Sequence, residues 1–351
     1  MTATSAVSVS GMSGLKGRRR KGIQLGQELV QFKPLFDADD YLLLATPTTK
    51  GIDFLAWAKQ YRNLIEEKLL RHGAILFRGF GVQEPAHFER CIEAISGASL
   101  EYKFRASPRT QIAGNIFTST DYPADQPIFP HNEHAYSPVF PLRLYFCCHT
   151  PPGVRGETPL GDNRKILRDI DPEVVAKFKA KKILYVRNYG DGFGLPWRTV
   201  FQTDDPSEVD AYCRSIGIET EWKANDRLRT KQVGPAIMKH PRTGEDLWFN
   251  HGTFFHVTTL TPVISGQLQQ QFAEEDLPTN TYYGDGSSIE PEVLEHLRDV
   301  YRRNMVMFPW QQGDFVLLDN MLSVHARSPY GGKRKVLTGM AEAYEASALQ
   351  A

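Results

Sequence analysis

The chain has 351 residues, of which 41% are hydrophobic and 23% are charged, so it can bury a large core in one elaborated domain or in two modest ones. Its 41 basic residues balance its 41 acidic residues, which excludes a strong overall field for nucleic acid or an anionic membrane and favours a small-molecule partner. No apolar run approaches the ~18 residues of a membrane span, and the four cysteines lack the spacing of a disulfide scaffold, so we expect a soluble, cytoplasmic protein.

The first 24 residues differ in composition from the rest of the chain. Ser, Gly, Lys and Arg dominate them, and no acidic residue precedes Glu28. Residues 1–24 are therefore predicted to form a disordered basic tail, although the basic run 16–21 would also suit a targeting signal. We expect the remaining residues, 25–351, to form a single domain.

Helices and strands alternate after this tail. Asp53 caps a predicted helix whose apolar residues recur at helical spacing until Gly73, and a buried strand is predicted directly afterwards, at 74–77. The other predicted elements are helices at 85–95 and 205–217, and extended segments at 136–146, 236–239, 246–250, 315–319 and 335–343.

The motif His131-Asn132-Glu133 is the first candidate for a functional site. The pattern His-x-Asp/Glu is expected about once by chance in a chain with 10 histidines and 41 acidic residues, and it occurs twice. The other copy, His87-Phe88-Glu89, falls in a predicted helix, where side chains two residues apart point to nearly opposite sides. His131 and Glu133 precede an extended aromatic stretch, and on a strand their side chains share one face. They could therefore converge on one metal ion.

His325 can supply a third ligand. It follows the segment 310–320, which is typical of a turn into a buried strand, and a histidine just past a strand end is well placed to face a pocket. Two imidazoles and one carboxylate on one face of a divalent metal leave positions open for a co-substrate and O2, as in non-haem Fe(II) oxygenases. Arg334 follows nine residues later, and its guanidinium suits bidentate capture of a dicarboxylic acid. The plainer alternatives are a hydrogen-bonded core histidine and a solvated surface arginine.

Several short motifs occur in a characteristic order, at 79–80, 107–110, 114–116, 118–123, 131–133, 136–138, 156–159, 325–327 and Arg334. Together they resemble the TauD/TfdA superfamily of Fe(II)/2-oxoglutarate-dependent dioxygenases, most closely its clavaminate-synthase-like and SyrP-like branch. The resemblance spans roughly residues 70–343. It implies an α+β or mainly β fold with a jelly-roll core, that is, a double-stranded β-helix, flanked by helices and carrying the metal triad at one open end.

The resemblance also implies roles for individual residues. His131, Glu133 and His325 would hold Fe(II), while Arg334 and Thr158 would bind the distal carboxylate of 2-oxoglutarate. The family usually has this arginine slightly further from the distal histidine, and Arg327 is the alternative.

Substrate contacts are implied less directly. The histidines of the segment 249–256 could contact a substrate or merely fill space, and His134 is expected to pack and not to ligate. The implied substrate-binding residues are Ser107, Arg109, Asn115, Asn250, His251 and His256.

The activity implied by the resemblance is oxidation of a small molecule. Fe(II), 2-oxoglutarate and O2 would hydroxylate an unactivated C–H bond of an amino acid or an amino-acid-derived natural-product intermediate, free or tethered to a peptidyl carrier protein, releasing succinate and CO2. The same site could instead catalyse desaturation, epoxidation or cyclisation, whereas Glu133 disfavours halogenation, because halogenating relatives carry a small residue there. Other classes remain open: a cupin-like metal-binding or sensing protein, and, least favoured, a zinc hydrolase, for which no HExxH motif is present. The sequence predicts no oligomeric state.

Overall fold

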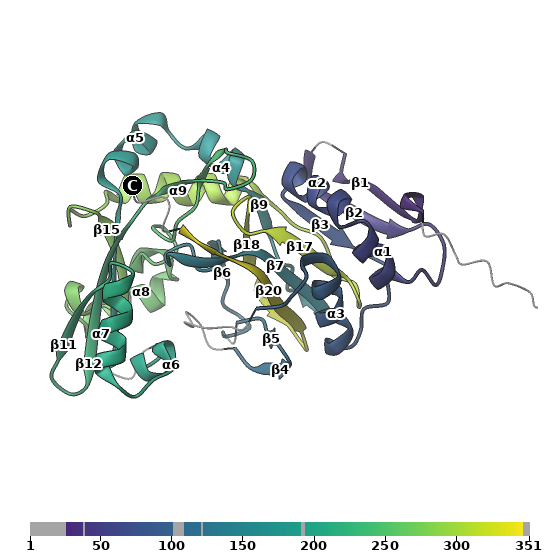
Figure 1. Ribbon diagram of the computed structural model, residues 1–351. Helices are drawn as coiled ribbons and strands as arrows, with labels where there is room; N and C mark the ends of the chain where they lie inside the picture. Colours follow the sequence, from purple (N-terminus) through teal and green to yellow (C-terminus); the bar gives the residue numbers. More distant parts are fainter. Residues whose placement is uncertain (1–25, 38, 101–108, 121, 191–193, 347–351) are drawn as a thin grey trace, which may run out of the picture.

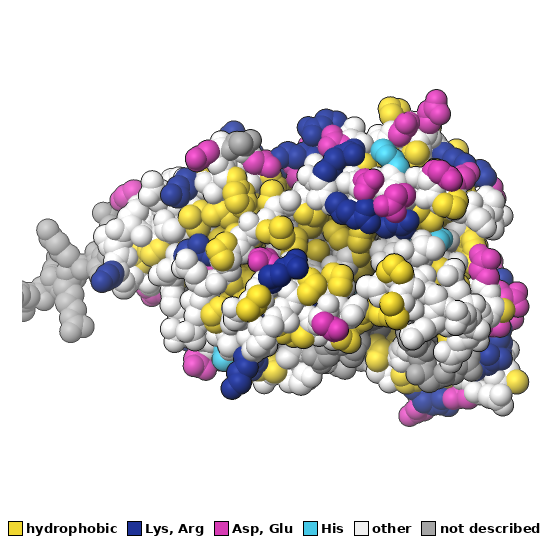
Figure 2. Space-filling view, turned by 180° about the vertical axis from the view of Figure 1, so that it is seen from behind, with side chains coloured by type: hydrophobic (Ala, Val, Ile, Leu, Met, Phe, Trp, Pro, Cys, Tyr) yellow, Lys and Arg dark blue, Asp and Glu magenta, His cyan; other side chains and the backbone are white. Residues whose placement is uncertain are grey.

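The computed structural model describes residues 26–37, 39–100, 109–120, 122–190 and 194–346. The predicted tail, residues 1–24, lies outside these ranges. Two facing sheets occupy the centre, and helices lie outside them (Figure 1). No helix in the described ranges is long and apolar enough to cross a membrane. Acidic and basic side chains are interspersed on the face seen in Figure 2, as the balanced charge predicts.

The larger of the two facing sheets, called the main sheet here, has the strand order β1-β2-β3-β17-β7-β20-β5-β4. β2 and β3 pair in parallel, and the other neighbours are antiparallel. β17 is buried on both faces, which explains why its sequence is a continuous apolar run. The strands of the main sheet are β1 (Val30–Phe36), β2 (Asp39–Pro47), β3 (Ala74–Phe77), β4 (Gln111–Ala113), β5 (Ile116–Thr118), β7 (Val139–Thr150), β17 (Phe315–Asp319) and β20 (Lys335–Glu345).

The smaller facing sheet, called the minor sheet, has the order β16-β9-β18-β6 and is antiparallel. Leu160 of this sheet packs with Leu144, Phe146 and Val336 of the main sheet in one buried apolar cluster. The two sheets therefore form the sandwich expected of a jelly roll. The strands are β6 (Ile128–His131), β9 (Leu160–Asp162), β16 (Met305–Val306) and β18 (Ser323–Arg327).

A third sheet lies beside this sandwich and has the order β11-β12-β10-β15 (Figure 1). Its strands are β10 (Ile183–Tyr189), β11 (Glu219–Lys223), β12 (Arg227–Gly234) and β15 (Thr279–Tyr283). Two-stranded pairs are formed by β13 (Ile237–Lys239) with β14 (Asp246–Trp248), and by β8 (Val154–Arg155) with β19 (Tyr330–Gly331).

The helices divide into two groups. Side chains of α1, α2 and α3, such as Trp57, Ile65 and Phe88, pack against Phe77 and Phe315 of the main sheet. The other helices lie toward the third sheet (Figure 1), with α4 nearest the first group, since its Arg164 donates a hydrogen bond to the carbonyl of Leu70 in α2. The α-helices are α1 (Phe54–Gln60), α2 (Arg62–His72), α3 (Pro85–Ser96), α4 (Asn163–Asp169), α5 (Pro172–Lys181), α6 (Trp197–Phe201), α7 (Pro206–Ser215), α8 (Pro262–Gln271) and α9 (Pro291–Arg303), and short 3-10 helices occur at Gln27–Leu29, Val257–Thr259 and Glu274–Asp276.

Most of the predicted elements are confirmed, with one helix divided. The strands predicted at 74–77 and 315–319 are β3 and β17, and the helix predicted at 85–95 is α3. The helix predicted between Asp53 and Gly73 is instead the pair α1 and α2, because Tyr61 leaves the helical conformation with φ −110° and ψ 31°. Neither Gly nor Pro marks this break, so helical spacing alone could not reveal it.

Candidate metal centre

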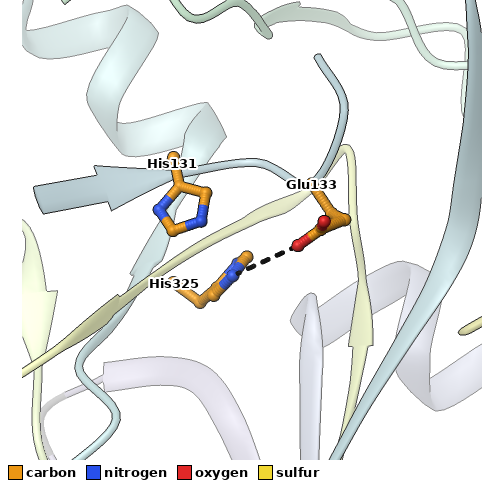
Figure 3. Close-up of side chains that lie close together, drawn as sticks. All are labelled: His131, Glu133 and His325. Atoms are coloured by element: carbon orange, nitrogen blue, oxygen red, sulfur yellow. Dashed lines mark ion pairs between the residues drawn. The ribbon is translucent and has the colours of Figure 1, made fainter. Parts of the chain in front are cut away.

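Two side chains of the segment 131–133 and one from β18, almost 200 residues later, converge between the two sheets. Ligand atoms of His131, Glu133 and His325 all lie within 4.8 Å of one another, and no other such group of three occurs in the described ranges. The two imidazole centroids are 4.3 Å apart, and Nε2 of His325 lies 3.9 Å from Oε2 of Glu133 (Figure 3). Ligand atoms that lie about 2.1 Å from one metal ion lie about 3 Å from one another. Small side-chain rotations would therefore bring these three ligand atoms around an ion.

The backbone under these residues differs from the expectation. His131 ends β6, whereas Glu133 lies in the turn 133–136, so the two residues do not share a strand as predicted. His325 is the central residue of β18 and pairs with His131 across the minor sheet, so it does not follow a strand end. The predicted convergence is present, but the cross-strand pairing of the histidines and the turn after β6 produce it.

Buried amide side chains hold the turn that carries Glu133. Asn320, in the β17–β18 connection, accepts a hydrogen bond from the N–H of Glu133 at 2.8 Å and donates to the carbonyls of Glu133 and Pro141 at 2.9 Å. Asn132 donates to the carbonyls of Asn320 and Ser323 at 2.5 and 2.9 Å. Both asparagines are fully buried, so these bonds are shielded from water. The turn is thereby fixed to the strand that supplies His325.

Two contacts orient the ring of His131. Its Nδ1 lies 2.9 Å from the carbonyl of Phe129, which requires Nδ1 to carry the proton and leaves the lone pair of Nε2 for a metal. The ring of Phe254 stacks on the imidazole with centroids 4.3 Å apart and 17° between the planes. Phe254 belongs to the segment 249–256, but nothing in the sequence marks it as a site residue.

The protonation states suit metal binding. Burial lowers the pKa of His131 and that of His325, so both rings are neutral and can ligate. Burial raises the pKa of Glu133, but the charge of Arg109 and smaller contributions from neighbouring histidines together outweigh it and hold the carboxyl pKa well below its usual range. Nη2 of Arg109 lies 2.8 Å from Oε2 of Glu133. Two neutral imidazoles and a carboxylate therefore present the donor set that the sequence predicts for Fe(II).

A cationic pocket extends from these residues. His131 and His325 line the pocket together with Arg334, Arg327 and Thr158. Burial, and then the charge of Arg327, lowers the pKa of Arg334 to about 10, so it remains protonated at neutral pH. Two neighbouring guanidinium groups in a partly buried pocket favour an anionic ligand.

The hydroxyl group of Thr158 can donate a hydrogen bond into the pocket. Its oxygen accepts hydrogen bonds from Nε1 of Trp310 at 3.1 Å and from Nη2 of Arg334 at 3.3 Å. A hydroxyl has two acceptor sites and one donor, so the two N–H groups direct its own proton elsewhere, toward the pocket that Thr158 lines.

The sequence matches the family described as taurine catabolism dioxygenase TauD, TfdA family, over residues 33–341. The chain belongs to this family. Dapdiamide synthesis protein DdaC of Enterobacter agglomerans is 36% identical over 304 residues, which cover 87% of this chain and 92% of that protein. A clavaminate synthase-like protein of Arabidopsis thaliana is 28% identical over 297 residues, covering 82% and 87%.

Solved structures confirm the jelly-roll fold of this TauD/TfdA oxygenase. PvcB, described as an Fe, alpha-ketoglutarate dependent oxygenase from an isonitrile synthetic pathway, superimposes with a TM-score of 0.56 at 15% identity, covering 92% of this chain and 96% of PvcB. A taurine dioxygenase from Burkholderia xenovorans gives a TM-score of 0.52 at 14% identity, with 89% of each chain covered. The family assignment makes the chain an Fe(II)- and 2-oxoglutarate-dependent oxygenase, and it favours this reading over a cupin-like sensing protein or a zinc hydrolase.

The residues predicted to contact substrate are scattered in this oxygenase. Arg109 donates a hydrogen bond to the carboxylate of Glu133. His251 contacts the backbone next to the turn 133–136, with Nε2 2.6 Å from the carbonyl of Asn132. Asn115 donates to Ser99 near α3 and is not among the described residues that line the metal pocket. Asn250 donates to the carbonyl of Ala236, His256 caps the 3-10 helix Val257–Thr259, and Ser107 lies outside the described residues.

Proposed function

We propose that His131, Glu133 and His325 bind Fe(II), and that Arg334 and Thr158 bind the distal carboxylate of 2-oxoglutarate. The observation that carries this proposal is that one pocket is lined both by two of the ligands, His131 and His325, and by Arg334 and Thr158. A five-carbon dicarboxylate can chelate a metal through its keto acid end while its far carboxylate meets the guanidinium.

Hydrogen bonding favours Arg334 over Arg327 for this role. Arg327 directs Nη1 and Nη2 at the carbonyls of Tyr122, Pro123 and Gln126, at 2.9, 2.5 and 2.7 Å. Arg334 uses Nε for the carbonyl of Gly156 at 2.8 Å, and its Nη contacts are longer, at 3.3 and 3.4 Å. Arg327 is therefore committed to the backbone, and its charge assists Arg334 in attracting an anion.

Fe(II), when bound, supplies O2 activation coupled to decarboxylation of 2-oxoglutarate, so that one oxygen atom enters succinate and the other is available for the substrate. The residues of this chain position the reactants. Arg109 keeps Glu133 ionised, and Phe254 holds the His131 ring. Phe146 and Val336 give the pocket apolar walls that restrict water around the reacting groups.

The reaction we propose is hydroxylation of a C–H bond in an amino acid or an amino-acid-derived intermediate, free or presented on a carrier protein. The substrate, 2-oxoglutarate and O2 would give the alcohol, succinate and CO2. The similarity to DdaC, which is named as a dapdiamide synthesis protein, supports the proposal that the substrate is an intermediate of small-molecule biosynthesis. Desaturation, epoxidation and cyclisation use the same residues, and the position of the substrate decides among them.

The proposal is tested by turnover with matched variants. Free and carrier-bound amino acids are incubated with the protein, Fe(II), 2-oxoglutarate and O2, and succinate and products are measured by mass spectrometry. A gain of one oxygen indicates hydroxylation, and a loss of two hydrogens indicates desaturation or ring closure. Glu133→Ala and Arg334→Ala should lower succinate formation at least about 100-fold.

The matched control is Arg302→Ala, which removes an exposed arginine of α9, 56% accessible, and should leave succinate formation unchanged. Wild-type rates in Glu133→Ala would contradict the ligand assignment. Wild-type rates in Arg334→Ala at low 2-oxoglutarate would contradict the assignment of the carboxylate site.

A further inference from the structure

Thr338 of β20 places a buried hydroxyl group in the wall of the cationic pocket. The residue is fully buried, and it lines the pocket together with His131, His325 and Arg334. Its Oγ1 has no hydrogen-bond partner among the described residues. Burying a hydroxyl without a partner costs free energy, because its hydrogen bonds to water are lost and not replaced. The hydroxyl of Thr338 is therefore available to a ligand that enters the pocket.

Strand pairing places Thr338 beside the metal centre. In the main sheet Thr338 lies directly opposite Phe146 of β7, and the Cβ atoms of such a pair are about 5 Å apart. The ring centroid of Phe146 lies 5.0 Å from that of His325. Phe146 and Thr338 both line the pocket, so both side chains point toward the minor sheet, which carries His325. Thr338 is thus next to the residue that packs on a candidate iron ligand.

The site proposed for the distal carboxylate lies further along the same pocket. In the minor sheet His325 pairs with Leu160, and Thr158 lies two residues before Leu160 in a segment that continues the pairing with β18. Thr158 is therefore about 7 Å from the level of His325 along the strands. Nη2 of Arg334 lies 3.3 Å from Oγ1 of Thr158. His325 and Thr338 thus mark one end of the pocket, and Thr158 and Arg334 mark the other.

The length of 2-oxoglutarate matches this separation. Four C–C bonds of about 1.5 Å join its terminal carbons, which are about 5 Å apart in an extended chain. When the distal carboxylate is on Arg334, the keto acid end reaches the level of His325 and Thr338. A carboxylate only accepts hydrogen bonds, and a threonine hydroxyl can donate one. The unpartnered hydroxyl therefore suits the carboxylate of the keto acid end.

We propose that the hydroxyl of Thr338 donates a hydrogen bond to the carboxylate of 2-oxoglutarate that chelates the metal. This inference rests on the proposed function, because it requires the pocket to bind 2-oxoglutarate. It assigns one hydroxyl to each end of the co-substrate, Thr158 to the distal carboxylate and Thr338 to the chelating one. Thr338 is then a positioning group for the keto acid end, and Arg334 determines the preference for a dicarboxylate.

The test compares 2-oxoglutarate with 2-oxopentanoate, which has the same keto acid end but a methyl group in place of the distal carboxylate. Affinities are measured by anaerobic titration into the Fe(II)-loaded protein, followed by the metal-to-ligand charge-transfer absorption band. Thr338→Val, which removes the hydroxyl and keeps the shape of the side chain, should weaken binding of both keto acids about 10-fold. Arg334→Ala should weaken binding of 2-oxoglutarate and leave the affinity for 2-oxopentanoate unchanged.

Two controls separate recognition from an effect on the fold. Thr338→Ser keeps the hydroxyl and should retain the wild-type affinity for both keto acids. Without ligands, Thr338→Val should bind Fe(II) as tightly as wild type and unfold at a urea concentration no lower than wild type, because the hydroxyl has no partner among the described residues. A lower unfolding midpoint in Thr338→Val would mean that the hydroxyl is bonded within the fold, and would overturn the inference.

Failure of this inference can be told from failure of the proposed function. If wild type shows the absorption band and Thr338→Val binds both keto acids with unchanged affinity, or loses affinity for 2-oxoglutarate alone, the inference is overturned and the Fe(II)–2-oxoglutarate centre stands. If wild type shows no band with either keto acid, the proposed function and the inference are both refuted. A loss for both keto acids that Thr338→Ser restores would support both.

Discussion

Asn320 offers a sharp test of how the metal site is held. Its side chain makes three buried hydrogen bonds, to both backbone polar groups of Glu133 and to the carbonyl of Pro141. Asn320→Ala leaves these groups buried without that partner, at about 1–3 kcal/mol each, so we expect the free energy of unfolding to fall by about 3 kcal/mol or more. The loosened turn should also weaken Fe(II) binding by about 10- to 100-fold.

The assay combines urea unfolding with anaerobic titration of Fe(II) into the folded variant. The control is Asn280→Ala in β15. Asn280 is also a buried asparagine, and its side chain makes hydrogen bonds with Val257 and Tyr282, neither of which is a candidate metal ligand. This control should lose stability and keep its iron affinity. Equal iron affinities in Asn320→Ala and wild type would refute the reasoning, because the turn would then be held without the amide.

Two further predictions concern the co-substrate and the dependence of stability on pH. Thr158→Val removes the hydroxyl directed into the pocket and should weaken 2-oxoglutarate binding about 10-fold while leaving Fe(II) affinity unchanged; a parallel loss of Fe(II) affinity would mean that Thr158 acts only through the fold. Burial raises the pKa of Asp319, but Arg143 and His240 outweigh it and lower the pKa from 3.8 to about 2. Because the folded-state pKa lies below the unfolded one, this carboxylate stabilises the protein fully above about pH 4, and about 2 kcal/mol is lost as the pH falls through about 2. The difference in the free energy of unfolding between wild type and Asp319→Asn, measured by urea unfolding, should therefore shrink as the pH falls from about 4 to about 2. A difference that stays constant would contradict the lowered pKa of Asp319.

Local patterns in the sequence predicted the elements that local physics controls. The strands β3 and β17 are almost wholly apolar runs, and α3 has Pro85 in its first turn and is followed by Gly97, so their bounds follow from composition and end signals. The division at Tyr61 has no such signal. The single domain predicted for 25–351 and the disordered tail remain predictions.

The convergence of His131, Glu133 and His325 was predictable from their residue types and order, although the expectation that His131 and Glu133 share one strand was wrong. The residues that orient the candidate ligands could not be predicted, because they reach the ligands through contacts between distant parts of the chain. Arg109 meets Glu133 and Phe254 stacks on His131, across separations that no spacing rule covers. Asn320 could have been suspected only as a polar residue close to the apolar run 315–318, where a buried amide needs partners, and Asn132 stands between His131 and Glu133 without even that signal.

The central claim is that His131, Glu133 and His325 hold Fe(II) beside a 2-oxoglutarate site formed by Arg334 and Thr158. The most direct measurement is the visible absorption spectrum after anaerobic addition of Fe(II) and 2-oxoglutarate, which reports direct chelation of the metal by the keto acid as a metal-to-ligand charge-transfer band. We predict this band in wild type, its loss in Glu133→Ala, and a requirement for more 2-oxoglutarate in Arg334→Ala. Absence of the band in folded wild-type protein, or its full retention in Glu133→Ala, would contradict the account.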